Sequence, residues 1–139
     1  MRDISYIDRQ IDSYLAVVCF AYNNRYPHVL ICETTDLLNS ICKELLLSMG
    51  KEPGTSLNSN IEHLALHEFN PIILNLIKQY YELQYVLVTA DSIDLVGFLC
   101  SVSCIFLELR RCFIKANSEL ADKLTKLGIS ICKFIDTLI

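Results

Sequence analysis

One long uncharged stretch constrains the fold of this chain more than any other feature. Residues 95–107 are apolar or small without interruption, and charged side chains stand on both sides, beginning with Asp94 and Glu108. As an α-helix the stretch would be about 20 Å long, short of the ~30 Å hydrocarbon core of a bilayer. A helix that is apolar on every side but too short to cross a membrane is typical of the centre of a helical bundle. We therefore expect a bundle around a central hydrophobic helix over residues 91–112.

The composition favours a single all-α domain over residues 1–139. A chain of 139 residues with 53% hydrophobic residues can bury one sizeable core. Only three prolines and four glycines are present, too few for the many turns of a sandwich or barrel. The net charge is −4 and no stripe of lysine or arginine appears, so nucleic acid is not an expected partner.

The N-terminal sequence predicts a cytoplasmic protein. Residues 1–15 carry acidic side chains with amphipathic spacing, where a signal peptide would have an apolar run. The apolar stretch at the other end, residues 127–139, is too short for a membrane anchor and is interrupted by Lys133 and Asp136. We expect at most peripheral membrane association.

The seven cysteines do not suggest a disulfide scaffold. An odd count without CxxC spacing, in a chain expected to stay in the cytosol, is typical of cysteines that act as small buried apolar residues. Cys32 alone lies near an expected loop. The other six fall within apolar helical patterns: Cys19, Cys42, Cys100, Cys104, Cys112 and Cys132.

Apolar periodicity and end signals divide the chain into about seven helices. The clear loop is the stretch KEPGTSLNSN, because proline, glycine and a cluster of Ser and Asn cannot sustain a helix. Residues 85–90 have strand propensity but no strand to pair with. Asn117 or Ser118, and then Gly128, are expected to divide the remainder of the chain into two shorter helices. The expected helices cover residues 3–22, 35–49 and 60–68, a fourth starting at Asn70-Pro71, a fifth over 91–112, and two shorter ones after it.

Catalytic and metal-binding patterns are nearly absent. His63 and His67 have the four-residue spacing of two metal-binding histidines on a helix, but the motif EHLALHEF lacks the glutamate of a zinc protease and a third ligand. The chain has no glycine-rich phosphate loop and no GxSxG motif. We expect no enzyme activity, no cofactor and no metal, so the function should be the binding of another protein.

Three stretches stand out in this helical order: residues 7–22, IDRQIDSYLAVVCFAY, residues 42–50, CKELLLSMG, and residues 91–99, DSIDLVGFL. Together they resemble the Bcl-2 apoptosis regulators, in particular their short viral members. The first stretch looks like the amphipathic first helix of that family, the second is similar to its second helix, and the third stands at the opening of its buried fifth helix. The resemblance implies a Bcl-2-like fold with a surface groove that receives an amphipathic death-motif (BH3) helix.

The second of these stretches admits two interpretations. The resemblance puts Cys42, Leu46 and Met49 on the apolar positions of the family motif and Gly50 on its small position. The family has Asp next, where this chain has Lys51. Alternatively, Leu46 and Met49 belong to the core, and Gly50 is the left-handed residue that ends the helix. Both interpretations can hold together.

The third stretch departs from the family pattern. Family members carry Asn-Trp-Gly-Arg here, and the Arg pairs with an Asp of the partner helix. One register puts residues 91–94 on those positions, and a register shifted by four uses Gly97 and puts Phe98 where the Arg belongs. Neither register supplies an arginine. An exposed ion pair contributes only about 0–1 kcal/mol to binding, so the absence of this arginine predicts an altered choice of partner more than a loss of binding.

The resemblance and the apolar patterns together predict a groove between the second, fourth and fifth helices. For each of its residues the alternative is ordinary core packing, although three tyrosines within KQYYELQY cannot all face one core. The expected groove residues are Leu46, Met49, Ile77, Tyr80, Tyr81, Tyr85, Asp94, Leu95, Gly97 and Phe98.

The resemblance then implies an anti-apoptotic regulator, a viral inhibitor of host cell death that sequesters pro-apoptotic Bcl-2 proteins through their death-motif helices. Such a protein would act in the host cytosol and reach the mitochondrial surface only through its partners. The alternative is a helical adaptor that self-associates, with its first and last helices forming a homodimer interface, or that binds an innate-immune signalling protein.

Overall fold

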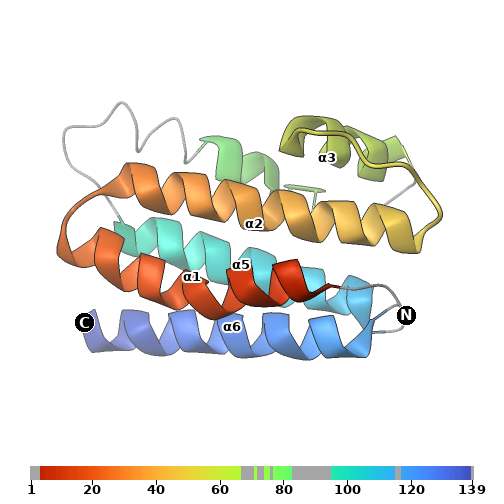
Figure 1. Cartoon of the computed structure of the whole chain (residues 1–139). Helices are drawn as coiled ribbons and strands as arrows, with labels where there is room; N and C mark the ends of the chain where they lie inside the picture. The colour runs from red at the N-terminus through yellow and green to blue at the C-terminus, as the bar shows by residue number, and fades with distance from the viewer. Residues whose placement is uncertain are drawn as a thin grey trace.

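The described residues of the computed structural model, 4–66, 71, 74–75, 77–82, 95–114 and 117–138, form an all-helical bundle without a strand (Figure 1). The residues described between 71 and 82 are also helical, and we call them the 71–82 segment. The labelled helices are α1 (Ser5–Asn23), α2 (Pro27–Ser48), α3 (Leu57–Leu66), α5 (Leu95–Phe113) and α6 (Ser118–Leu138). The predicted fold class, a helical bundle, is confirmed at this level. Predictions for His67, Asn70, Tyr85, Asp91, Asp94 and the 85–90 strand fall outside the described residues.

Four long helices form the body of the bundle. α1 and α6 lie side by side and run in the same direction, and α5 runs antiparallel to α6 (Figure 1). α5 packs most extensively against α6, and α2 contacts α1, α3 and α5. At the centre, the Tyr14 hydroxyl bonds Thr34, and its ring meets Phe106 edge-on at 5.7 Å.

The boundary between α1 and α2 differs from the expected one. α2 begins at Pro27, not at residue 35. Thr34 and Thr35, at the expected start, lie inside the helix, and their hydroxyls donate to the carbonyls of Leu30 and Ile31, one turn back. A proline at the first helical position explains the earlier start, because no N–H is needed there.

The end of α2 confirms one of the two interpretations of Gly50. Gly50 has φ +72°, its N–H donates to the Leu47 carbonyl at 3.1 Å, and the Lys51 N–H donates to the Leu46 carbonyl at 2.9 Å. These two bonds form a Schellman cap. α1 ends in the same way with Arg25, at φ 50°, in the glycine position. Arginine there lacks the conformational freedom that glycine brings.

The C-terminal region is one helix, and the predicted break at Gly128 is wrong. α6 continues from Ser118 to Leu138, and Gly128 is buried within it. A Cβ at Gly128 would lie 2.7 Å from Leu107 Cδ2, so the glycine serves close packing of α5 on α6. The predicted start is confirmed, because Asn117 Oδ1 accepts a hydrogen bond from the Leu120 N–H at 3.1 Å.

The expectation that α5 is covered on every side is also wrong. Its buried face carries large apolar residues such as Phe98, Val102 and Phe106, but Cys100 and Cys104 are exposed. Cysteine, serine and glycine read as apolar or neutral in a hydropathy pattern, yet they are small enough to border solvent at little cost. α5 therefore has an outer edge, and the uncharged sequence did not require burial all round.

The cysteines are less buried than expected. Only Cys42 is buried, and Cys19 and Cys112 are half-buried. The remaining four, Cys32, Cys100, Cys104 and Cys132, are exposed. Cys32 lies inside α2, because that helix starts earlier than its sequence indicated.

Candidate functional site

The structure brings three of the predicted groove residues together where the 71–82 segment meets α5 and α2. The Tyr80 ring lies 5.7 Å from the Phe98 ring of α5 and 6.0 Å from the ring of its neighbour Tyr81, measured between centroids. Leu46 of α2 belongs to the hydrophobic core, to which all the helices contribute. The 71–82 segment and α5 therefore form an aromatic junction on this core.

The predicted groove residues that the structure describes differ in accessibility. Five are buried core residues, as the alternative interpretation held: Leu46, Ile77, Tyr80, Leu95 and Phe98. Met49, at the end of α2, is 38% exposed, and Tyr81 and Gly97 are half-buried. A partner can reach these three without displacing the core. Tyr85 and Asp94 lie outside the described residues.

Tyr80 is fixed by hydrogen bonds across the junction. Its hydroxyl lies 2.7 Å from Thr35 Oγ1 and 3.3 Å from the Ile31 carbonyl, both on α2. A buried phenol with such partners loses little by leaving water. Tyr80 therefore anchors the 71–82 segment to α2.

Tyr81, the next residue, has the opposite property. Its hydroxyl oxygen is buried and forms no hydrogen bond within the described structure. Burial, with a smaller contribution from Cys42, raises the pKa of Tyr81 to about 12, so the hydroxyl stays neutral and can donate a hydrogen bond. Leaving such a group without a partner costs about 1–3 kcal/mol. Unpartnered buried hydroxyls are uncommon, and this one lies in the predicted wall.

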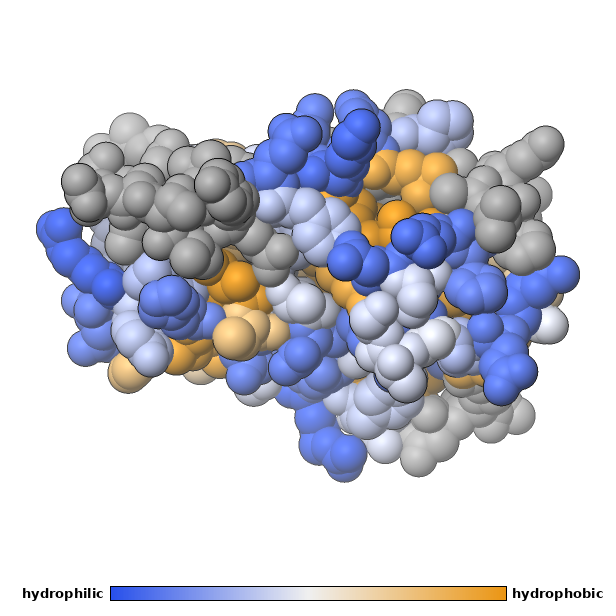
Figure 2. Space-filling model, turned by 90° about the horizontal axis from the view of Figure 1, so that it is seen from above, coloured by the Kyte–Doolittle hydropathy of each residue, from blue (hydrophilic) through white to orange (hydrophobic). Residues whose placement is uncertain are grey.

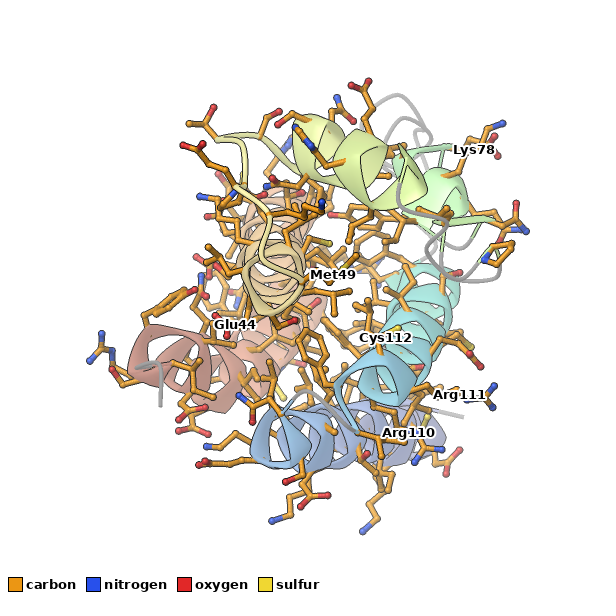
Figure 3. The ribbon with its side chains drawn as sticks, turned by 90° about the vertical axis from the view of Figure 1, so that its right-hand side faces the viewer. Glu44, Met49, Lys78, Arg110, Arg111 and Cys112 are labelled. Atoms are coloured by element: carbon orange, nitrogen blue, oxygen red, sulfur yellow. The ribbon has the colours of Figure 1, made fainter. Side chains whose placement is uncertain are left out.

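The thiols beside this junction are also neutral. Burial raises the pKa of Cys42 to about 12 and that of Cys112, on α5, to about 11. Figure 3 shows Cys112 and Met49 at the same end of the molecule, on neighbouring helices. The junction thus has apolar and uncharged walls.

The outer edge of α5 continues the accessible surface. Gly97, Cys100, Ser101 and Cys104 are three, four or seven residues apart, except for the adjacent pair Cys100 and Ser101, so they lie on one side of the helix. All four are exposed or half-buried. Their small side chains would let another helix approach the α5 backbone closely. On the adjoining face above α2 and α3, apolar surface shows between polar side chains (Figure 2).

A second surface, which the sequence did not identify as a groove, lies between α1 and α6. A hollow of about 310 Å³ opens there. Its lining residues are Ile11, Asp12, Leu15, Lys123, Lys126, Leu127 and Ser130. An ion pair, Lys123 Nζ to Asp8 Oδ1 at 3.3 Å, stands beside it. The sequence shows both amphipathic helices, but it does not show that they lie next to each other.

Neither surface has the features of a metal centre. Within the described ranges, no three His, Cys, Asp or Glu side chains gather closely enough to hold a metal ion. Among the helices described, none is both long and apolar enough to cross a membrane.

Comparison of the chain with known proteins gave no match. No protein-family model, no curated protein and no solved structure matches it. The class defined by the fold is an all-α helical bundle, and its function must be argued from its own surfaces.

Proposed function

We propose that this protein binds the amphipathic death-motif (BH3) helices of pro-apoptotic proteins, and that it is an anti-apoptotic, Bcl-2-like viral inhibitor of host cell death. The bound helix lies along the accessible part of the junction, between Tyr81 and the outer edge of α5. The observation that carries the proposal is the buried Tyr81 hydroxyl, which has no hydrogen-bond partner within the described structure.

The shape of the accessible surface supports a helical ligand. Met49, Tyr81 and Gly97 come from three different elements. Met49 lies at the end of the molecule that holds Cys112, whereas Gly97 stands near the start of α5, so a ligand that reaches all three must be elongated. The small residues on the outer edge of α5 allow a second backbone to come close. An amphipathic helix binds such a surface with apolar residues at positions i, i+3 or i+4, and i+7.

The energetics do not require the missing arginine. Each buried Leu or Ile of the ligand contributes roughly 1.5–3 kcal/mol before the costs of ordering. Nanomolar binding corresponds to about −12 kcal/mol, so four apolar anchors give a dissociation constant in the nanomolar range or slightly weaker binding. A ligand acceptor that bonds the Tyr81 hydroxyl adds about 0.5–1.5 kcal/mol.

Calorimetric titration with a panel of death-motif peptides tests the proposal. Each peptide is paired with a control in which the apolar anchor residues are changed to glutamate. We expect sub-micromolar binding of at least one parent peptide and none of its control. Met49→Glu should weaken binding, whereas Ile129→Glu on the far helix α6 should leave it unchanged. No binding of any peptide at micromolar concentration would rule the proposal out.

The alternative is an adaptor that acts by self-association or by binding an innate-immune signalling protein. The hollow between α1 and α6 favours it, because it lies on a surface that the groove does not use. If a death-motif peptide displaces the natural partner from the protein, the groove is supported. If the partner stays bound in the presence of the peptide, the adaptor is supported.

A further inference from the structure

A stripe of accessible residues runs along the side of α1 that lies next to α2. The two helices lie side by side (Figure 1), and Tyr14 bonds Thr34 across their contact. The other side of α1 faces α6, because Asp8 pairs there with Lys123. Residues at three- or four-residue steps on either side of Tyr14 are exposed or half-buried, and they line the outer edge of this contact. They are Tyr6, Gln10, Ser13, Val17 and Phe20.

α2 carries a matching stripe. One side of α2 is used by the 71–82 segment and α3, because Thr35 bonds Tyr80 and Asn39 bonds Asn60 there. The side towards α1 carries exposed or half-buried residues at steps of four or seven, namely Val29, Glu33, Ser40 and Leu47. We call the two stripes, with Arg25 and Tyr26 of the turn between the helices, the α1–α2 face.

The α1–α2 face gathers large apolar side chains at the surface. Among the described residues seven such side chains are exposed, and four of the seven belong to this face. Phe20 is 52% exposed and Tyr26 48%, and Tyr6 and Leu47 are 38% exposed each. Single exposed apolar residues are ordinary, but a gathering of them marks an interaction surface. Three of the four are aromatic, and two carry a hydroxyl that can stay in water while the ring is buried.

The charges on this face differ in sign from that of the whole chain, whose net charge is −4. Arg9 and Lys43 each stand three residues after a member of a stripe, so they flank the face on α1 and α2. Arg25 is exposed in the turn. Glu33 is the one exposed acidic residue among the described members of the face. Three cations to one exposed acid make the face attractive to a negatively charged surface.

We propose that the α1–α2 face docks on the surface of an anionic membrane. Helices of 19 and 22 residues are about 28–33 Å long, so the face is extended enough to meet several lipid headgroups at once. The rings of Phe20 and Tyr26 enter the headgroup layer, and the three cations lie over lipid phosphates. Aromatic residues combined with basic ones are typical of the membrane–water interface. The face lies on a different side of α2 from Thr35 and the groove, so it acts independently of the bound helix.

The expected binding is weak and depends on salt. A basic residue close to an anionic surface strengthens binding about fivefold, and burial of one exposed aromatic ring strengthens it about tenfold. These side chains should together bind more weakly than a myristoyl chain, whose association constant is about 10⁴ M⁻¹. Binding is therefore expected at millimolar lipid, and high salt should reduce it because ions screen the attraction.

Sedimentation of the whole chain with vesicles tests the proposal. We expect binding to phosphatidylcholine vesicles that contain about 30% phosphatidylserine, and much weaker binding to pure phosphatidylcholine. Phe20→Ser should weaken binding about tenfold and Arg9→Gln about fivefold. Glu33→Gln should strengthen binding by up to about fivefold, a gain that misfolding would not produce.

Two matched controls separate the face from apolar character and charge in general. Ile129→Ser removes a similarly exposed apolar side chain on α6, and Lys78→Gln removes an exposed cation on the 71–82 segment (Figure 3). Both variants should bind vesicles like the wild type. Circular dichroism checks that every variant is folded. Titration with a death-motif peptide, run in parallel, should give the same affinity for Phe20→Ser and the wild type, so membrane docking and the groove can fail separately.

Three results would overturn membrane docking. The first is no binding to the anionic vesicles at low salt and about 10 mM lipid. The second is equal binding to both kinds of vesicle, or equal losses for Phe20→Ser and Ile129→Ser. The third comes from light scattering without lipid: if the wild type associates and Phe20→Ser abolishes the association, the face is a contact between protein molecules.

Discussion

The adjacent tyrosines of the 71–82 segment should respond in opposite directions to the same substitution. Tyr81→Phe removes a buried hydroxyl that has no hydrogen-bond partner among the described residues, so the free energy of unfolding should rise by about 1–2 kcal/mol. Tyr80→Phe removes the hydroxyl that bonds Thr35 and the Ile31 carbonyl, so stability should fall by about 1 kcal/mol. The two variants lose the same atom, which makes each the control for the other.

Urea unfolding followed by circular dichroism measures both changes, and the midpoint should shift while the slope stays constant. For a chain of this length each kcal/mol corresponds to roughly 3–4 °C in Tm. If Tyr81→Phe destabilised the protein as much as Tyr80→Phe, the Tyr81 hydroxyl would have an intramolecular partner. The main support for the proposed groove would then be lost.

The same variant bears on function. A bound helix that accepts a hydrogen bond from Tyr81 loses it in Tyr81→Phe, so peptide affinity should fall about 2–10-fold although the free protein is more stable. Stability and affinity changing in opposite directions would distinguish a binding residue from a purely structural one. An unchanged Kd would show that the ligand does not use this hydroxyl.

Three further outcomes follow from the backbone and the buried groups. Arg25→Gly should raise the free energy of unfolding by about 0.5–1 kcal/mol, because glycine adopts the left-handed backbone conformation of this position without strain. Gly50→Ala should lower the free energy of unfolding by a similar amount for the converse reason. Urea unfolding measures both changes. Gly128→Ala should cost about 1–3 kcal/mol, because its methyl group would meet Leu107; a control substitution at exposed Ile129, Ile129→Ala, should change stability by less than about 0.5 kcal/mol. Burial raises the Cys42 pKa from 9.0 to about 12, so the unfolded thiol ionises first. The stability it contributes is present below pH 9 and is lost between pH 9 and about 12, and Cys42→Val should flatten this decline in urea titrations.

Local signals in the sequence predicted much of the fold. Apolar periodicity gave α1 almost to the residue, and Asn117 marked the start of α6, because such a cap needs only neighbouring atoms. Gly50 was predicted as a helix end for the same reason. These features depend on residues within one turn of each other, so a single sequence contains the necessary information.

Features that depend on tertiary contact could not be predicted in this way. Gly128 reads as a helix breaker until Leu107 is placed against it. Threonine hydroxyls near an expected helix start can cap that helix or bond the preceding turn, and only the structure shows that Thr34 and Thr35 do the latter. The edge of α5 around Cys100 reads as buried, because hydropathy does not tell whether a small residue meets protein or solvent.

The same distinction between local signals and tertiary contacts applies to the candidate surfaces. Three of the residues predicted for the groove, Tyr80, Tyr81 and Phe98, do meet at one junction, but the sequence could not indicate which groove residues are core and which are accessible. Tyr80 and Tyr81 are indistinguishable by pattern, and only their hydrogen bonds separate them. The α1–α6 hollow required knowing which helices are neighbours.

Amide chemical-shift mapping of the ¹⁵N-labelled protein with a death-motif peptide is the most direct measurement. We predict shifts concentrated at Met49, Tyr81 and Gly97 and along the outer edge of α5, with little change at Asp12 or Lys126. A spectrum that does not respond to any peptide, or that responds only along α1 and α6, would contradict a helix-binding groove at this junction.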